Sequence, residues 1–332
     1  MKGPEAVTQS AEPRPKTGRP LFRMLRYAVA CVLIVVLVTQ VDISSSLKIV
    51  SSASLPLLLL CWLGMLSVYF TKSLALRMVM SVHGSVPMSH LFAWGLVGAF
   101  FSNFLPSQAG GDLVKGVYLG RYIGSVREAY AAMLVQRGLT ALDSLLMAMG
   151  AVSILVPPGR LGLDAGAGRV WAAGLAAAVM LAGLALGRRR LIPALLAFPL
   201  TRSVAGKGVA FVRSVLAYRH RPGLMTAVFA FSFFIFFQGV LVTWLAALTV
   251  GGTIPFATIF LASSFSQLSA LIPISPGGVG VGESIFTASC SLMGTRPEEA
   301  LAVALIMRLV LVTSSLTGGL IYLVWAPPAR DQ

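Results

Sequence analysis

Two arginines lie inside long apolar stretches of the sequence, where charged residues are rare. Arg137 lies in an apolar run over 129–156, and Arg308 lies in another over 300–326. An arginine at the centre of a bilayer costs ~2.5–3.5 kcal/mol on insertion scales, so it normally faces a partner or a wet cavity. A guanidinium forms paired hydrogen bonds with a carboxylate or a phosphate. The two arginines therefore predict ion pairs, a phosphate-binding site, or both at different stages of a cycle.

Each arginine follows a motif that combines a proline, a glycine pair and an acid. The glycine pairs are Gly110–Gly111 and Gly277–Gly278, each four residues after a proline. The acids are Asp112 and Glu283, and we predict that they pair with Arg137 and Arg308, respectively. Asp143 is a poorer partner for Arg137, because six residues of helix turn the chain by about 240°.

Other polar residues near the motifs are expected to contact the same ligand. They are Lys115, Asn103, Ser275 and Gln267. Lys72 and Arg77 either add to a basic funnel at the first motif or serve only to set the topology of the chain. We expect no metal and no cofactor, because the three cysteines and three histidines are isolated from one another and from carboxylates. We assign no catalytic residue.

The composition excludes an ordinary soluble globule. The 332 residues are 57% hydrophobic and 11% charged, against about 25% charged in soluble domains. The net charge of +15 on so apolar a chain indicates a membrane protein with basic loops, not a nucleic-acid-binding protein. We therefore expect membrane lipids, and anionic ones in particular, as partners.

The elements that must position these residues are apolar helices. Full membrane spans are predicted at 27–41, 54–71, 129–156, 169–187, 224–249 and 300–326. Arg188–Arg190 mark a cytoplasmic loop, and the positive-inside rule then places both termini in the cytoplasm. On that topology the segment 89–127 begins and ends inside, while 252–297 begins and ends outside.

These two segments are predicted to be re-entrant helical hairpins that enter from opposite faces. The fold class is thus an all-α polytopic membrane protein with about six transmembrane helices plus two re-entrant hairpins in an inverted repeat, a pattern found in many secondary transporters. The competing interpretation is that Pro-Gly turns join ordinary spans. We expect a disordered cytoplasmic tail over 1–20, one membrane domain over 21–326, a basic amphipathic segment over 191–222 and a short tail over 327–332.

The two motifs together resemble a known family. The pattern from Asn103 to Lys115 and the pattern from Leu271 to Glu283 are similar to the transmembrane domain of lysylphosphatidylglycerol synthases, which also defines the UPF0104, YbhN-like or flippase-like membrane proteins. In the synthases this domain is associated with moving the product lipid between leaflets. The match is close from Gly277 to Glu283 and looser at Gln108 and Ala109.

The resemblance implies a lipid-handling domain in the cell membrane. In relatives, a soluble aminoacyl- or glycosyl-transferase domain accompanies it; the sequence ends at Gln332 without one, so we do not expect an enzyme. The leading hypothesis is a flippase-like protein that moves a phosphate-bearing, anionic or lipid-linked lipid. The alternatives are a non-transporting partner or regulator of a lipid-modifying enzyme, and an embedded lipid transferase.

Overall fold

A computed structural model of the chain describes residues 54–82, 84–104, 109–155, 218, 221–252, 254–270 and 280–324. Within these ranges the chain forms eight α-helices and no strand. The predictions for 1–20, 27–41, 169–187 and 327–332, and nearly all of 191–222, fall outside the described residues.

Four of the described helices are long and apolar enough to cross a membrane. They are α3 (Leu55–Met80), α6 (Val126–Leu155), α10 (Pro222–Thr249) and α13 (Pro297–Val324). They confirm four of the predicted spans, but the predicted end of the first of them at residue 71 is wrong. The helix α3 continues through Lys72 to Met80, because residues 73–80 are mostly good helix formers and bury an apolar face while Arg77 stays exposed.

The other four helices are short and come in pairs. One pair is α4 (Met88–Ser102) with α5 (Ala109–Ile123), and the other is α11 (Phe256–Ser269) with α12 (Val281–Leu292). The longest of them has 15 residues and so extends about 22 Å, less than the ≈ 30 Å of a bilayer core. Within each pair the two helices pack against each other, as the prediction of helical hairpins requires.

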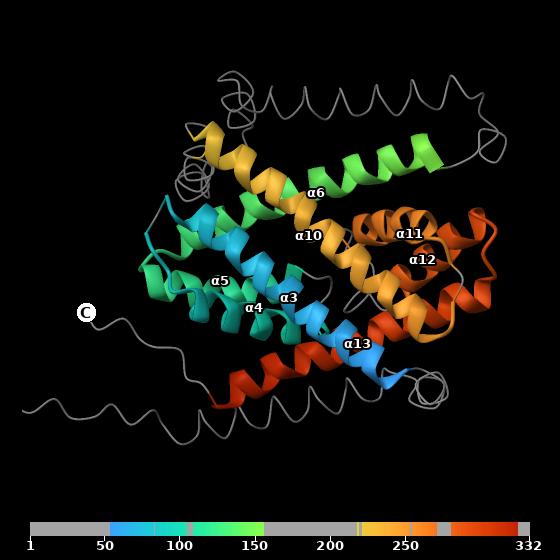
Figure 1. Cartoon of the computed structure of the whole chain (residues 1–332). Coiled ribbons are helices and arrows are strands. Elements are labelled where there is room, and N and C mark those ends of the chain that lie inside the picture. Colours follow the sequence, from blue (N-terminus) through green and yellow to red (C-terminus); the bar gives the residue numbers. More distant parts are fainter. Residues whose placement is uncertain are drawn as a thin grey trace, which may run out of the picture.

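The described helices form two halves with matching arrangements. The set α3, α4, α5 and α6 corresponds in order and approximate length to α10, α11, α12 and α13. Packing follows the same correspondence: α13 lies on α4 as α6 lies on α11, and α3 packs directly on α10. Figure 1 shows α3 and α10 running in opposite directions, and α6 and α13 likewise. A hydrogen bond from Ser54 N–H to the carbonyl of Thr249 joins the start of α3 to the end of α10. This antiparallel correspondence is an inverted repeat.

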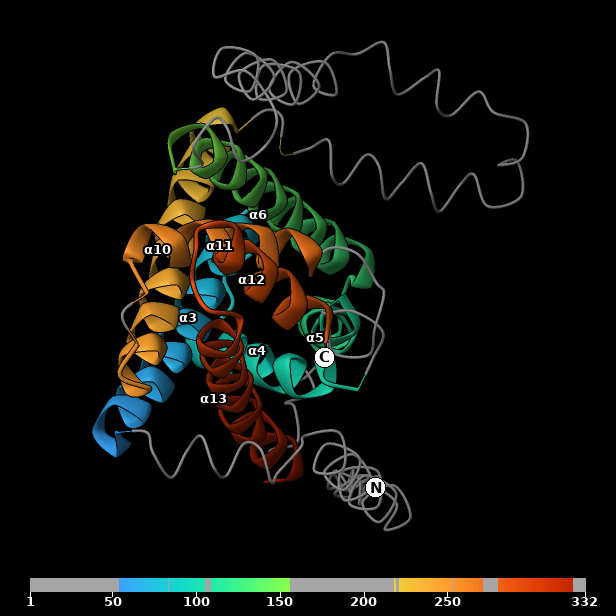
Figure 2. The same cartoon turned by 90° about the vertical axis from the view of Figure 1, so that its right-hand side faces the viewer.

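The two hairpins approach the centre of the molecule from opposite sides. The pair α4–α5 and the pair α11–α12 lie at opposite ends of the view in Figure 1, and the rotated view in Figure 2 shows α11 and α12 enclosed by α6, α10 and α13. Two separate clusters of buried apolar residues surround them. One joins α3, from Cys61 to Ala75, to α10–α13, and the other joins the end of α3 to α4, α5, the start of α6 and the start of α10.

Small residues allow the two helices of each hairpin to approach closely. A Cβ on Gly111 would overlap the carbonyl of Gly98 and the hydroxyl of Ser102. The backbones of α4 and α5 are therefore in close contact at Gly111. In the second hairpin, the hydroxyl of Ser266 donates to the carbonyl of Gly282 at 3.2 Å. Close backbone contact at small residues is the usual way that helices associate within membranes.

Candidate functional site

A cavity of about 440 Å³ lies where the two halves meet. All eight described helices contribute residues to its wall. The charged side chains that line it are Lys72, Asp112, Lys115, Arg137, Glu283 and Arg308. Five of these six are residues that the sequence predicted for a ligand site, and Lys72 is the addition.

The first predicted ion pair is present. Arg137 donates from Nη1 to Oδ2 of Asp112 at 2.8 Å, linking α6 to α5. The other carboxylate oxygen of Asp112 lies 3.1 Å from Nζ of Lys115, one turn further along α5. Asp112 lies in the first turn of α5, where the partial positive charge of the helix N-terminus also favours a carboxylate. One acid is thus held between two cations.

The second predicted ion pair is also present, with a different supporting contact. Nε of Arg308 on α13 lies 3.3 Å from Oε1 of Glu283. Oε2 of Glu283 accepts a hydrogen bond from the backbone N–H of Gly280 at 2.9 Å, which caps the start of α12. Gly280 has a φ of +83°, in the left-handed region that favours glycine. The side chains of this pair are 13% and 15% exposed, against 28% and 35% for Arg137 and Asp112, so the second pair is more deeply enclosed.

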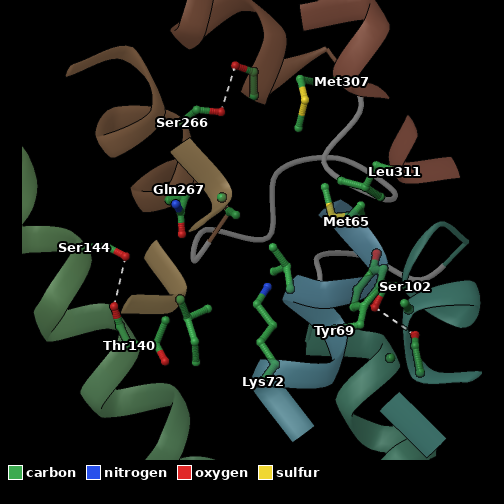
Figure 3. Close-up of a pocket in the computed structure, with 18 of the residues that line it drawn as sticks. Met65, Tyr69, Lys72, Ser102, Thr140, Ser144, Ser266, Gln267, Met307 and Leu311 are labelled. Atoms are coloured by element: carbon green, nitrogen blue, oxygen red, sulfur yellow. Dashed lines mark hydrogen bonds between the residues drawn. The ribbon is translucent and has the colours of Figure 1, made fainter. Parts of the chain in front are cut away.

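The described part of the cavity wall carries more positive than negative charge. Four cations face two carboxylates, which leaves an excess of two positive charges. Lys72 accounts for one of them, because no carboxylate of the described residues lies within ion-pair distance of its ammonium group. Figure 3 shows the Lys72 side chain extending from α3 toward the middle of the cavity. An anion of suitable size would therefore be attracted to this space.

The remaining predicted site residues fall into three groups. Gln267 and Gly111 line the cavity, as does Asn103. The amide of Asn103 is nevertheless engaged in the fold, because it donates to Oγ of Ser315 at 2.8 Å and to the carbonyl of Phe100. Gly110 is buried at the start of α5 and does not line the cavity. Ser275, Gly277 and Gly278 lie outside the described residues.

Sequence reasoning missed a polar stripe on α6. Gln136, Thr140 and Ser144 recur every four residues and line the cavity beside Arg137. Their spacing places them on one face of a helix that is otherwise apolar, and this periodicity could have identified them. Gln136 also fixes the neighbouring helix, since its side-chain amide donates to the backbone carbonyl of Lys72 at 2.9 Å. Figure 3 shows Thr140 and Ser144 joined by the hydrogen bond from the Ser144 hydroxyl to the Thr140 carbonyl, at 2.9 Å.

Lys72 was the other residue whose position the sequence did not settle. Its charge ends the apolar run before it, so a hydropathy pattern places it at the edge of a span. The continuation of α3 to Met80 instead places Lys72 well within the helix and on the cavity wall. Both basic residues of α3 are exposed, but Lys72 lines the cavity and Arg77 does not.

Comparisons with known proteins show which family the chain belongs to. Residues 23–318 match the family described as "Lysylphosphatidylglycerol synthase TM region". A UPF0104 membrane protein of Pyrococcus horikoshii is 27% identical over 114 residues, and the aligned part is 34% of this chain and 34% of that relative. Because the family match spans nearly all of the described helices and both ion pairs, the chain belongs to the lysylphosphatidylglycerol synthase transmembrane-region family of membrane proteins.

Proposed function

We propose that the protein is a flippase-like carrier, which moves a lipid with a phosphate-bearing, anionic head group across the cytoplasmic membrane. The observation that carries the proposal is the central cavity with two arginine–carboxylate pairs and an excess of two positive charges. Family membership supports a lipid-related function in a membrane. The cavity supplies the specific chemistry, because guanidinium groups bind phosphate in the same paired manner as carboxylate.

A phosphate would bind by exchange with the carboxylates. Arg137 can release Asp112 and take a phosphate, because Asp112 keeps its contact with Lys115, 3.1 Å away. Arg308 can do the same, because Glu283 keeps its hydrogen bond from Gly280. In each case the released carboxylate retains one partner, so the exchange does not leave a buried charge without a partner. Without such a second partner, opening the pair would be strongly unfavourable.

The inverted repeat supports alternating access to this cavity. In transporters with such repeats, one half rocks against the other around a site near the middle of the bilayer. The pair on α5 and α6 and the pair on α12 and α13 occupy corresponding positions in the two halves. Asp112 and Glu283 would then close and release their arginines in turn as the cavity opens to one face and the other. The driving force would be a lipid or an ion gradient.

The outer surface of the first hairpin is suited to contact with lipid chains. Leu113 and Val117 on α5 are 58% and 38% exposed, although both are large apolar residues. They follow Asp112 along the same helix, so a lipid whose head group reached the cavity could keep its chains against this apolar side. With the N- and C-termini in the cytoplasm, as the positive-inside rule indicates, the first hairpin enters from the cytoplasmic face.

The experiment is lipid movement in proteoliposomes of defined composition. The purified chain is reconstituted with fluorescent phosphatidylglycerol or with fluorescent phosphatidylcholine, and transfer between leaflets is followed by quenching from outside. Wild type is compared with Arg137→Ala and Arg308→Ala. Arg121→Ala is the matched control, because Arg121 lies on α5 but is exposed and outside the cavity wall. Monodisperse elution of each variant establishes that it is folded.

The proposal expects wild type and Arg121→Ala to move the anionic lipid faster than the zwitterionic one, and both cavity variants to lose this movement. It is overturned if wild type moves no lipid from a panel of anionic and lipid-linked substrates. Activity that appears only with a co-purifying enzyme would instead support a partner or regulator of a lipid-modifying enzyme. A covalently altered lipid would support an embedded transferase.

A further inference from the structure

One acid in the membrane part of the protein is not used by the cavity mechanism. Asp143 lies in the second half of α6 with 0% of its surface exposed. Within the part of the chain that the structure describes, neither oxygen of its carboxylate has a hydrogen-bond partner. A buried ionised carboxylate without donors is strongly unfavourable, and such a group stays neutral by holding a proton. Acids inside membrane helices are rare and usually functional for this reason.

Asp143 lies just outside the cavity face of α6. Asp143 lies seven residues after Gln136, which lines the cavity, and seven residues turn a helix to within about 20° of two full turns. Ser144, which follows it in sequence, and Thr140, about one turn earlier, also line the cavity. Asp143 itself does not line the cavity. A small rotation of α6 relative to its neighbours would therefore move Asp143 from its buried position to the polar cavity.

The helices that pack on α6 leave Asp143 without a compensating charge in this conformation. These helices are α3, α5, α10 and α11, of which α10 and α11 contain no ionisable side chain. On the cavity side, the ionisable groups of α3 are Tyr69 and Lys72, those of α5 are Asp112 and Lys115, and that of α6 itself is Arg137. No cation among the described residues forms an ion pair with Asp143, since Lys115 and Arg137 are both paired with Asp112.

From the buried, unpartnered carboxylate beside the cavity we infer that Asp143 is a proton-binding site that couples lipid movement to a proton gradient. The inference rests on the proposed function for its coupling, but not for the proton site itself. In the conformation described here Asp143 carries the proton. When α6 turns it toward the cavity, the O–H bond breaks, the proton passes to water in the cavity, and the carboxylate is stabilised by that water and by the positive charge of Lys72 on α3. Return of α6 requires a proton to bind again.

The proton site is tested without any lipid transport. Infrared spectra of the purified full chain at neutral pH report the C=O stretching band of protonated carboxylic acids. We expect this band in wild type and in the control Glu298→Gln, which changes an exposed acid at the start of α13, and its loss in Asp143→Asn. Asparagine matches the shape of the neutral acid, and Asp143→Ser serves if the amide variant does not elute as a folded protein. An identical band in wild type and both Asp143 variants would overturn the site.

The coupling is tested in proteoliposomes with an imposed pH gradient. For one proton per lipid, a gradient of about one pH unit supports up to about tenfold accumulation of fluorescent phosphatidylglycerol in one leaflet. Wild type and Glu298→Gln should accumulate the lipid, while Asp143→Asn should only equilibrate it. Accumulation by Asp143→Asn equal to wild type would overturn the coupling. If wild type moves no lipid but shows the infrared band, the proposed function and the coupling fail while the proton site stands.

Discussion

The guanidinium of Arg137 and the carboxylate of Asp112 meet at 2.8 Å although they lie 25 positions apart and on different helices. The contact ties the second helix of the first hairpin to the following membrane span. Its counterpart, between Arg308 and Glu283, does the same in the other half. Each hairpin is thus attached to the bundle through one ion pair. On the proposed function, a phosphate would take the place of the carboxylate in that pair.

Exchanging the two charges of the Arg308–Glu283 pair distinguishes a role of the pair in stability from a role in ligand binding. Arg308→Glu should lower the free energy of unfolding by about 3–5 kcal/mol, because it leaves Glu283 enclosed without its cation. The double variant Arg308→Glu with Glu283→Arg should recover part of this loss, but not the cap on Gly280. Thermal unfolding measures the first effect, and lipid transfer should stay absent in both. A double variant that moves lipid at the wild-type rate would show that the pair is purely structural.

Lys72 should contribute to binding of an anionic head group, and Arg77 should not. Lys72→Met removes a cation from the cavity wall, while Arg77→Met removes a cation of the same helix that lies outside the cavity wall. A hydrogen bond to a charged group contributes about 1.5–3 kcal/mol, so the Kd for phosphatidylglycerol should rise by about tenfold or more in Lys72→Met. Fluorescence titration of the purified variants measures this difference. Equal affinities would place Lys72 outside the binding site.

Gly111 should be intolerant of even one methyl group. Gly111→Ala forces α4 and α5 apart, because the new Cβ overlaps the carbonyl of Gly98, and overpacking of this kind costs about 1–3 kcal/mol. Gly150→Ala is the matched control on α6, where a Cβ has no neighbour within 4 Å. That variant should gain about 0.5–1 kcal/mol from helix propensity. Thermal unfolding that ranks the two variants in the opposite order would contradict the close approach of the hairpin helices.

Asn103 should act mainly through the fold. Asn103→Ala removes the bonds to Ser315 and to the carbonyl of Phe100, and should lower the unfolding free energy by about 1–3 kcal/mol. Ser315→Ala removes only the first of these bonds. A double-mutant cycle on thermal unfolding should give a coupling of about 1 kcal/mol between the two residues. A coupling energy near zero, together with loss of lipid binding in Asn103→Ala, would contradict this. It would support the sequence-based prediction that Asn103 contacts the ligand.

Much of the site could be predicted from the residues. An arginine within an apolar run must find a partner, and each hairpin motif offers one acid, so both pairings follow from the cost of an unpaired charge. For the four spans among the described residues, the boundaries followed from hydropathy with errors of a few residues, except at the end of α3. There the charge of Lys72 interrupts the pattern, although a helix carries a single lysine without difficulty when that lysine faces a cavity.

The sequence by itself therefore determined the helices, the repeat and the partners of the two embedded arginines, because these depend on local composition and on charge balance. The tertiary structure alone decided that Lys72 lines the cavity, that Asp143 is buried next to the cavity and that the backbones of Gly98 and Gly111 are in close contact. Those features depend on which faces of distant helices pack together. A residue's own neighbours in sequence carry no information about the surface that will cover it, so its role there could not be foreseen from the chain.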